Sequence, residues 1–240
     1  MNRFFLPEKS PESGLITIIG DDANHISNAL RKRAGDEIIF TRDGKDFFCL
    51  ISEIGPDFVS AAVMRVEAVH SEPKFKLTLF QALPKSDKME LVIQKCTELG
   101  VSKIVPFISD RCVSRPKDPA AKISRWRRVA ESAAKQSGRG IIPEVAEISL
   151  FDGIITQIAG FKNVSPVFLC NENGGEKLTL PKRAEAAAVI VGAEGGFTAR
   201  ETTLAESAGA VSITLGSRIL RCETAPIAAT SIIMYLAGEI

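Results

Sequence analysis

The chain has 240 residues, a length that predicts one large domain or two small ones. Hydrophobic residues make up 45% of it and charged residues 25%, values typical of globular proteins that exclude a disordered chain. The most apolar stretch, from Ala225 to Gly238, contains a proline and is too short to span a bilayer. The N-terminus lacks the apolar core of a signal peptide. We therefore expect a cytoplasmic protein that does not enter a membrane.

Cysteine and histidine usage argues against a metal enzyme. The cysteines are odd in number, and no two of them form a C-x-x-C pair; they lie at positions 49, 96, 112, 170 and 222. The two histidines, His25 and His70, are far apart. Metal sites need clustered ligands at close spacing, so we expect reduced thiols and no metal.

The net charge is +1 overall but differs between two parts of the chain. Residues 1–72 hold 8 Lys and Arg against 12 Asp and Glu, which leaves 22 against 17 for residues 73–240. A polyanion would therefore bind mainly to the C-terminal part, although an excess of this size is also common on ordinary surfaces.

The first part is rich in short β-strands. Hydrophobic and β-branched runs predict strands over 15–19, 37–41, 46–51 and 58–66. The turn 42–45 (RDGK) predicts a hairpin, and a helix is expected from Asp22 to Arg33 with Ile26 and Leu30 on its apolar face. About five strands in this length indicate a small barrel. The polar, proline-ended segment 68–73 indicates a linker.

From Lys74 onward, strands and helices alternate. Strands are predicted over 75–83, 101–108, 165–170, 186–192 and 211–216. Helices are predicted over 86–99, 119–137 and 151–158, from Thr198 onward, and through 227–238. Thr198 and Glu201 form a capping box, and Thr224 is expected to cap the last helix. The alternation predicts an α/β fold with a mostly parallel sheet that is covered on both faces.

Two turns that follow strands could together form one ligand pocket. The first, residues 192–196 (GAEGG), joins an apolar strand to the capped helix and matches neither a dinucleotide-binding motif nor a P-loop. In parallel sheets, ligands bind beyond the carboxyl ends of strands, where glycines let backbone amides approach closely. The alternative is a tight turn without a ligand.

The second turn, residues 215–224 (LGSRILRCET), follows the last strand. It carries Arg218, Arg221 and Glu223, a cluster suited to binding an anion or a base. The two arginines could equally be solvated, or could pair with Glu223 to hold the fold.

A third turn, residues 81–88, ends the first strand of this part. Lys85 and Lys88 lie at a helix start, where positive charge opposes the helix dipole, so a phosphate-facing role competes with plain solvation. Further basic residues lie at 125–128 and 135–139. Trp126, among them, falls on the apolar face of its helix and is predicted to be core rather than a platform for base stacking.

Six segments, spread from the first residues to the last helix, carry one common resemblance. They are RFF (3–5), LPKSDKMELVIQKCTELGV (83–101), ISDRCV (108–113), AAKQSGR (133–139), VGAEGGF (191–197) and LGSRILRCETA (215–225). In this order they resemble the RsmE family of 16S ribosomal RNA methyltransferases, over essentially the whole chain.

The resemblance implies two domains and an activity. Residues 1–70 would form a PUA-like RNA-binding β-barrel, and residues 73–240 a SPOUT methyltransferase domain with a deep C-terminal trefoil knot. A homodimer would bind S-adenosylmethionine (SAM) in the knot and methylate N3 of uridine 1498 in the 16S rRNA of the 30S subunit. Such chemistry needs neither a metal nor a covalent intermediate, because the sulfonium methyl group is already activated.

Matched to the family motifs, the cofactor-binding residues would be Leu169, Gly192, Ala193, Glu194, Gly195, Gly196, Leu215, Gly216, Ile219, Leu220 and Arg221. We expect Arg221 to stabilise the negative charge that develops on uracil, and Glu194 or Glu223 to accept the N3 proton. For RNA binding we expect the basic residues Arg3, Arg31, Lys32, Arg33, Lys85 and Arg139.

Three positions depart from the family pattern. Ala193 and Ser217 stand where the family commonly has proline, and Lys135 stands where it commonly has glutamate, which reverses a charge. Two other functions remain open: a SPOUT enzyme acting on another rRNA position or on tRNA, and a ribosome-assembly factor without activity. The intact glycines of both turns and Arg221 favour an enzyme.

Overall fold

The computed structural model describes residues 3–7, 11, 13–162, 164–172 and 174–240. The chain forms two compact units. The N-terminal unit comprises residues 1–72 together with 134–141, and the C-terminal unit comprises 73–133 together with 142–240. Residues 134–141, which belong to the N-terminal unit, were not expected there from the sequence.

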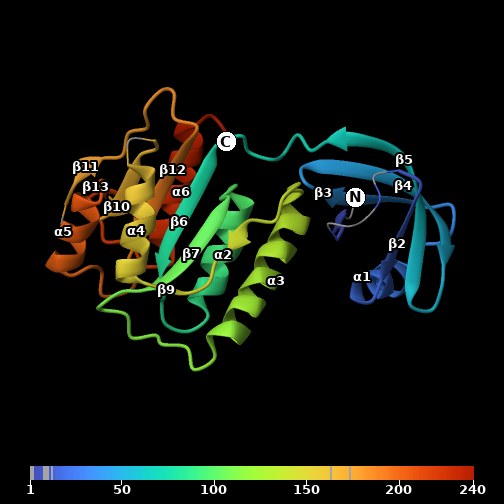
Figure 1. Cartoon of the computed structure of the whole chain (residues 1–240), viewed down its shortest axis with the longest axis horizontal. Coiled ribbons are helices and arrows are strands. Elements are labelled where there is room, and N and C mark those ends of the chain that lie inside the picture. The colour runs from blue at the N-terminus through green and yellow to red at the C-terminus, as the bar shows by residue number, and fades with distance from the viewer. Residues whose placement is uncertain (1–2, 8–10, 12, 163, 173) are drawn as a thin grey trace. The chain divides into compact units, whose positions relative to one another are not determined.

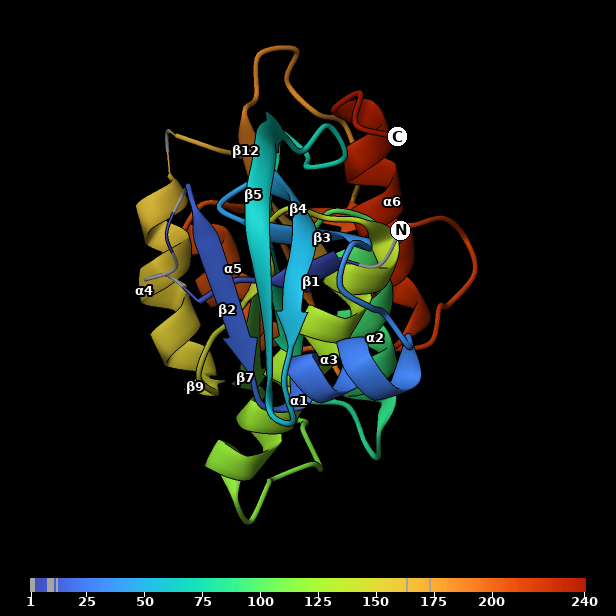
Figure 2. The ribbon, with the colours of Figure 1, turned by 90° about the vertical axis from the view of Figure 1, so that its right-hand side faces the viewer.

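One curled five-stranded sheet dominates the N-terminal unit (Figures 1 and 2). In spatial order its strands are β1 (Arg3–Phe5), β3 (Glu37–Arg42), β4 (Lys45–Ile54), β5 (Phe58–Ala68) and β2 (Leu15–Ile19). All pairs are antiparallel except β1 with β3. In β2, Ile16 and Ile18 are buried while Leu15 and Ile19 are exposed, the alternation expected of a strand with one face toward a core.

The predicted hairpin is confirmed. Arg42 pairs with Lys45 across a two-residue turn in which Asp43 and Gly44 both have positive φ, 50° and 73°. Turns of this kind suit the right-handed twist of the strands they join. A short sequence signal is sufficient here because the turn depends only on its own residues.

The helix predicted from Asp22 to Arg33 is wrong in length and type. An α-helical turn, α1 (Asp21–Asn24), passes into a π-helical turn, η1 (His25–Ala29), and the chain leaves it with Arg31 in the left-handed region at φ 52°. The Ser27 hydroxyl donates to the Ala23 carbonyl at 2.9 Å, which competes with regular helix bonding.

Segment 134–141 is tied to the rest of the N-terminal unit by ion pairs. Lys135 Nζ lies 3.1 Å from Asp22 Oδ1 and also lies over the Phe4 ring. The Arg139 guanidinium lies 2.7 Å from Glu72. Lys135, where the resemblance described above leads us to expect glutamate, therefore has an acidic partner in this chain.

A parallel eight-stranded sheet forms the centre of the C-terminal unit. Its order is β11 (Glu176–Lys177), β13 (Ala210–Thr214), β10 (Val167–Cys170), β12 (Ala186–Val191), β6 (Lys76–Ala82), β7 (Lys103–Ile108) and β8 (Glu144–Val145), with β9 (Ser149–Leu150) also paired to β7. Every pairing is parallel. The α/β prediction is therefore confirmed, although the short strands β1, β9 and β11 were not foreseen.

Helices cover both faces of this sheet, as predicted. They are α2 (Lys88–Glu98), α3 (Pro119–Ser137), α4 (Phe151–Phe161), α5 (Ala199–Ser207) and α6 (Thr224–Leu236). Figure 2 shows α4 on one side of the sheet and α2 with α6 on the other. Helix α6 packs against α2 and against the central strands β6 and β12, and Trp126 of α3 is buried in the core as expected.

Two helix starts differ in how well the sequence predicts them. The capping box of α5 is confirmed: Thr198 Oγ1 accepts from the Glu201 N–H, and Glu201 Oε2 accepts from the Thr198 N–H. The prediction that Thr224 caps α6 is wrong, because Thr224 is already helical and Glu223 occupies the cap position. The Arg221 carbonyl accepts from the N–H groups of Thr224 and Ala225 instead.

Candidate functional site

Three loops meet at the carboxyl ends of neighbouring strands in the C-terminal unit. Strand β10 lies between β12 and β13, and all three are parallel. The loops that follow them begin at Asn171, Gly192 and Leu215. Parallel strands place their following loops at one edge of the sheet, which is where ligands bind in such folds.

These loops enclose a cavity of about 370 Å³, a size suited to a small molecule. Its lining residues are Lys88, Cys170, Asn171, Glu172, Val191, Gly192, Ala193, Glu194, Gly196, Phe197, Thr214, Leu215, Gly216, Ser217, Arg218, Ile219, Leu220, Arg221, Cys222 and Ala225. The two predicted turns therefore do form one pocket, and most of the predicted cofactor-binding residues line it.

Glycine is required at two points of the first turn. Gly196 has φ 61°, and a Cβ added to it would lie 2.7 Å from Glu172 Oε1. A Cβ on Gly192 would lie 3.2 Å from the Gly196 Cα. The turn thus brings bare backbone to the cavity wall, where a side chain would fill the space and strain the chain.

Two of the predicted cofactor-binding residues do not line the cavity. Leu169 is fully buried within β10, and its neighbour Cys170 lines the cavity instead. Gly195 lies against Arg111: an added Cβ would lie 3.0 Å from the Arg111 Cβ, and Arg111 Nη1 donates to the Gly195 carbonyl at 2.9 Å. Gly195 therefore serves the packing of the turn rather than its ligand-facing side.

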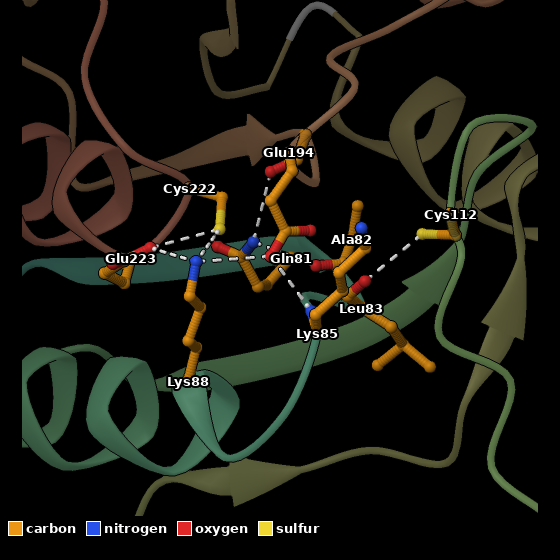
Figure 3. A network of polar contacts seen from close by, with 10 residues as sticks. Gln81, Ala82, Leu83, Lys85, Lys88, Cys112, Glu194, Cys222 and Glu223 are labelled. Carbon is orange, nitrogen blue, oxygen red and sulfur yellow. Dashed lines mark hydrogen bonds and ion pairs between the residues drawn. The ribbon is translucent and has the colours of Figure 1, made fainter.

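Lys88, at the start of α2, links the two predicted turns, 192–196 and 215–224, by charge. Its ammonium lies 3.3 Å from Glu194 Oε1 and 3.1 Å from Glu223 Oε2. Figure 3 shows Lys88 pointing toward both glutamates. The Cys222 thiol donates to Glu223 at 3.2 Å, and the Lys85 backbone N–H donates to Glu194 at 3.1 Å. Lys88 therefore binds two carboxylates of the chain, rather than facing a phosphate or solvent alone.

These contacts set the ionisation of the cluster. Desolvation would raise the pKa of Glu194, but hydrogen bonds from its own backbone N–H, from Lys85 and from Lys88 outweigh it and lower the pKa. For Glu223, hydrogen bonds from Cys222, from its own backbone N–H and from Lys88 likewise outweigh desolvation and lower the pKa. The hydrogen bond with Glu223 is the main cause of the raised Lys88 pKa.

The Cys222 thiol is held in its neutral form. Burial, with the hydrogen bond to Glu223 as a second cause, raises the pKa of Cys222 to about 12. A thiol with so high a pKa is a poor nucleophile at neutral pH. The absence of covalent catalysis expected from the sequence is consistent with this environment.

Arg218 and Arg221 line the cavity from the second turn with exposed side chains. Within the described part of the chain, the structure shows no ion pair between Arg221 and Glu223, because Glu223 pairs with Lys88. The alternative in which Arg221 holds the loop through Glu223 is therefore not what the structure shows. The Arg221 guanidinium remains available to a ligand.

The basic residues predicted to bind RNA fall into two groups. Arg31, Arg33 and Lys85 have exposed side chains, and Lys32 lies next to the first two with Nζ 3.1 Å from the Glu37 carbonyl. The other group is engaged within the N-terminal unit.

Arg3 and Arg139 form this second group. Arg3 donates to the Gly138 carbonyl and lies 2.6 Å from Asp46, and the Arg139 side chain is only 3% exposed in its pair with Glu72. The expected RNA contact of Arg139 does not agree with this burial, because its guanidinium is already satisfied.

The loop that follows β10, beginning at Asn171, was not predicted to be part of the site. Asn171 and Glu172 come directly after a predicted apolar strand, the same position as in the two turns that were recognised. The signal was present, but its use required knowing that β10 lies between β12 and β13. Gln81, at the end of β6, was also missed; it is buried, and its amide donates to the Gly192 carbonyl at 3.4 Å.

Comparison with known proteins identifies the family. A model of the RNA methyltransferase domain matches residues 70–234, and a model of the RNA methyltransferase PUA domain matches residues 18–64. The ribosomal RNA small subunit methyltransferase E of Bacillus subtilis is 33% identical over 98% of this chain and 96% of its own length. The chain belongs to the ribosomal RNA small subunit methyltransferase E family.

Solved structures of similar proteins have the same fold. The ribosomal RNA small subunit methyltransferase E of Neisseria gonorrhoeae, solved bound to S-adenosyl methionine, is 31% identical with a TM-score of 0.89 over 98% of both chains. A methyltransferase of Legionella pneumophila in complex with SAM is 29% identical with a TM-score of 0.86 over 97% of this chain and 96% of its own. The PUA-like and SPOUT assignments therefore agree with both halves of the fold.

The residues that line the cavity of this chain are themselves suited to SAM. Bare backbone at Gly192 and Gly196 can contact a polar ligand closely, as a Cβ there would not allow. The side chains of Phe197, Leu215 and Leu220 supply apolar wall for an aromatic ring. No helix in the described ranges is long and apolar enough to cross a membrane.

Proposed function

We propose that this protein is a SAM-dependent methyltransferase that modifies N3 of a uridine, uridine 1498, in the 16S rRNA of the 30S subunit. The observation that carries the proposal is the three-loop cavity, in which a glycine cradle and Arg221 share one space. The names of the relatives from Bacillus and Neisseria support small-subunit rRNA as the substrate. The uracil N3 position follows from the family resemblance of the two turns.

The cofactor, when bound, supplies a methyl group activated by its sulfonium. The residues of the chain have the remaining tasks of alignment and charge stabilisation. The backbone of residues 192–196 and 215–221 holds the cofactor, and Arg221 faces the base. Loss of the N3 proton places negative charge on the uracil ring, and a fixed guanidinium stabilises that charge more than the neutral ground state.

Between the two candidate bases, the geometry favours Glu194. Glu194 lines the cavity, whereas Glu223 does not. The Glu223 side chain is 16% exposed, accepts the Cys222 thiol and binds Lys88. We assign Glu194 the role of proton acceptor and Glu223 the role of positioning Lys88. The lowered pKa of Glu194 keeps its side chain ionised at neutral pH, which is the form that accepts a proton, and at the same time makes it a weaker base.

A division of labour between the two units is part of the proposal. Residues 73–240 bind the cofactor, within a trefoil knot that the family resemblance implies. The N-terminal unit positions RNA through the basic cluster of exposed Arg31 and Arg33 with half-buried Lys32, which offsets its overall negative charge.

We also propose a homodimer that uses the exposed apolar side of α6. Ile232, Tyr235 and Leu236 on that helix are 40%, 69% and 45% exposed, an unusual number of large apolar groups for one free helix face. Sedimentation of the wild-type chain beside Tyr235→Glu tests this. The variant should sediment as a monomer if α6 forms the interface.

The direct test of function is nucleotide mapping. The protein with SAM is incubated with 30S subunits from cells that lack the activity, and 16S rRNA fragments are analysed by mass spectrometry. A methyl group on N3 of uridine 1498, formed far more slowly with Arg221→Ala, is the expected result. Methylation at another rRNA or tRNA position would redirect the assignment, and tight subunit binding without SAM binding would indicate an assembly factor.

A further inference from the structure

The carboxylate of Glu172 reaches the cavity from the third loop. Glu172 lies two residues beyond the end of β10 and lines the cavity together with Gly196. Its Oε1 atom would be 2.7 Å from a Cβ on Gly196, so the carboxylate rests directly against the glycine turn. No family motif quoted for the chain includes this residue, and the function proposed above makes no use of it.

Glu172 differs from the other carboxylates of the site in its partners. Glu194 and Glu223 both share the ammonium of Lys88. Among the residues that the structure describes, no cationic side chain forms an ion pair with Glu172. Its negative charge is therefore not neutralised locally, and it lies at the wall of the space that a cofactor would fill.

We propose that Glu172 makes the pocket select the charge of its ligand, so that the cationic sulfonium cofactor binds more tightly than the thioether product. This inference rests on the proposed function, because it takes SAM as the ligand. SAM and the product S-adenosylhomocysteine differ by one methyl group and one positive charge. Glycines and apolar walls contact both forms alike and cannot tell them apart.

A carboxylate can make this distinction by electrostatics. Glu172 is an exposed residue, and an opposite charge several ångströms away at an exposed site is worth about 1 kcal/mol, which corresponds to about fivefold in affinity. Arg218 and Arg221 also line the cavity, but they lie on the second turn, residues 215–224. Glu172 instead lies against Gly196 of the first turn, residues 192–196. The preference would help the product to leave after each methyl transfer, since the spent cofactor lacks the charge that Glu172 attracts.

Glu172 could instead hold the ribose hydroxyl groups, as acidic residues do in many nucleotide sites. That role makes a different prediction, because the ribose is identical in SAM and in S-adenosylhomocysteine. A ribose-binding carboxylate would contribute equally to the binding of both, and its loss would leave their ratio unchanged.

The test is calorimetric titration of the full-length protein and of Glu172→Gln with three ligands. They are SAM, S-adenosylhomocysteine and sinefungin, which carries an ammonium where SAM carries its sulfonium methyl. In Glu172→Gln, SAM and sinefungin should bind about fivefold more weakly while S-adenosylhomocysteine changes little. Glu172→Asp, which keeps the charge, should keep the preference.

Glu176→Gln is the matched control. It removes one negative charge from an exposed glutamate of β11 that does not line this cavity. The ratio of its affinities for SAM and S-adenosylhomocysteine should therefore equal that of the wild type. An equal weakening of all three ligands in Glu172→Gln, or no change, overturns charge selection while leaving the proposed function intact. Failure of the wild type to bind SAM and S-adenosylhomocysteine at all would overturn both.

Discussion

The ammonium of Lys88 lies 3.1 Å from a carboxylate oxygen of Glu223. Lys88 is the first residue of α2, and Glu223 occupies the N-cap position of α6, so the pair joins the starts of two helices that pack against each other. The same ammonium reaches Glu194 in the first turn. One side chain outside both predicted turns thus holds them in a common arrangement.

Lys88→Met should therefore weaken cofactor binding without unfolding the protein. The substitution keeps the length of the side chain but leaves two neighbouring carboxylates without their shared cation. We expect about fivefold weaker SAM binding by calorimetry, because the turns then repel each other at a partly exposed site. Lys95→Met, which removes the half-buried Lys95–Glu98 pair of the same helix, is the control and should bind normally. Equal binding by both variants would contradict the role of Lys88.

The pH dependence of cofactor binding follows from the same cluster. The pKa values of Glu194 and Glu223 are lowered and that of Lys88 is raised, so all three stay charged through the neutral range. A carboxylate whose pKa is lowered on folding stabilises the folded cluster at pH values above the ordinary pKa of glutamate. That stabilisation is lost as the pH falls through the lowered pKa. SAM affinity should stay flat down to about pH 5 and fall only near pH 4 or below. A loss of affinity between about pH 5 and 7 would show that the cluster is not intact.

Arg221→Ala should slow methylation far more than it weakens cofactor binding. Removal of one donor to a developing anion typically lowers the rate by about 10²–10³. Single-turnover methylation of 30S subunits measures the rate, and calorimetry measures SAM affinity. Arg221→Lys should restore only part of the rate, because an ammonium lacks the planar fork of the guanidinium.

Arg218→Ala is the matched control for Arg221, since Arg218 lies on the same turn and also lines the cavity. A normal methylation rate for Arg221→Ala at saturating RNA and SAM would remove Arg221 from the mechanism. A parallel loss of SAM binding in Arg221→Ala and Glu223→Ala would instead assign it to holding the loop.

The two neighbouring glycines of the first turn should respond differently to alanine. Gly196→Ala forces a side chain into the left-handed region and against Glu172, at a cost of about 1–2 kcal/mol for the conformation alone. SAM affinity should fall by about tenfold or more. Gly195→Ala adds its methyl beside Arg111, away from the cavity, and should keep its affinity. The reverse order in calorimetry would mean that the ligand lies on the other side of the turn.

Replacement of Arg31, Lys32 and Arg33 by serine should weaken binding to 30S subunits and flatten its salt dependence. Each phosphate contact that is lost lowers the slope of log affinity against log salt by about one. SAM affinity should be unchanged. Arg65→Ser, in the exposed C-terminal end of β5 in the same unit, is the control for removal of positive charge. Unaltered methylation of subunits by the triple variant would contradict an RNA role for this cluster.

How well the sequence predicted each feature depended on how far apart the interacting residues lie. The capping box of Thr198 and Glu201 and the bounds of α3 depend on neighbouring residues and were predicted correctly. The π-helical turn at His25–Ala29 was not, because its residues carry an ordinary helical pattern. The carboxylate partners of Lys88 lie 106 and 135 positions away, so its sequence context left only a phosphate-facing role or solvation as alternatives. Glu172 was overlooked because the order of β13, β10 and β12 is a property of the sheet.

Because Lys135 pairs with Asp22, a substitution at one of these two distant positions constrains which residues the other can accept. Glutamate at 135 would place a negative charge beside the Asp22 carboxylate, so neither position can change sign alone without repulsion. The two should therefore covary among relatives, with lysine at 135 accompanying an acid at 22 and glutamate accompanying a neutral or basic residue. The reversed charge at 135 is then one half of a compensated exchange.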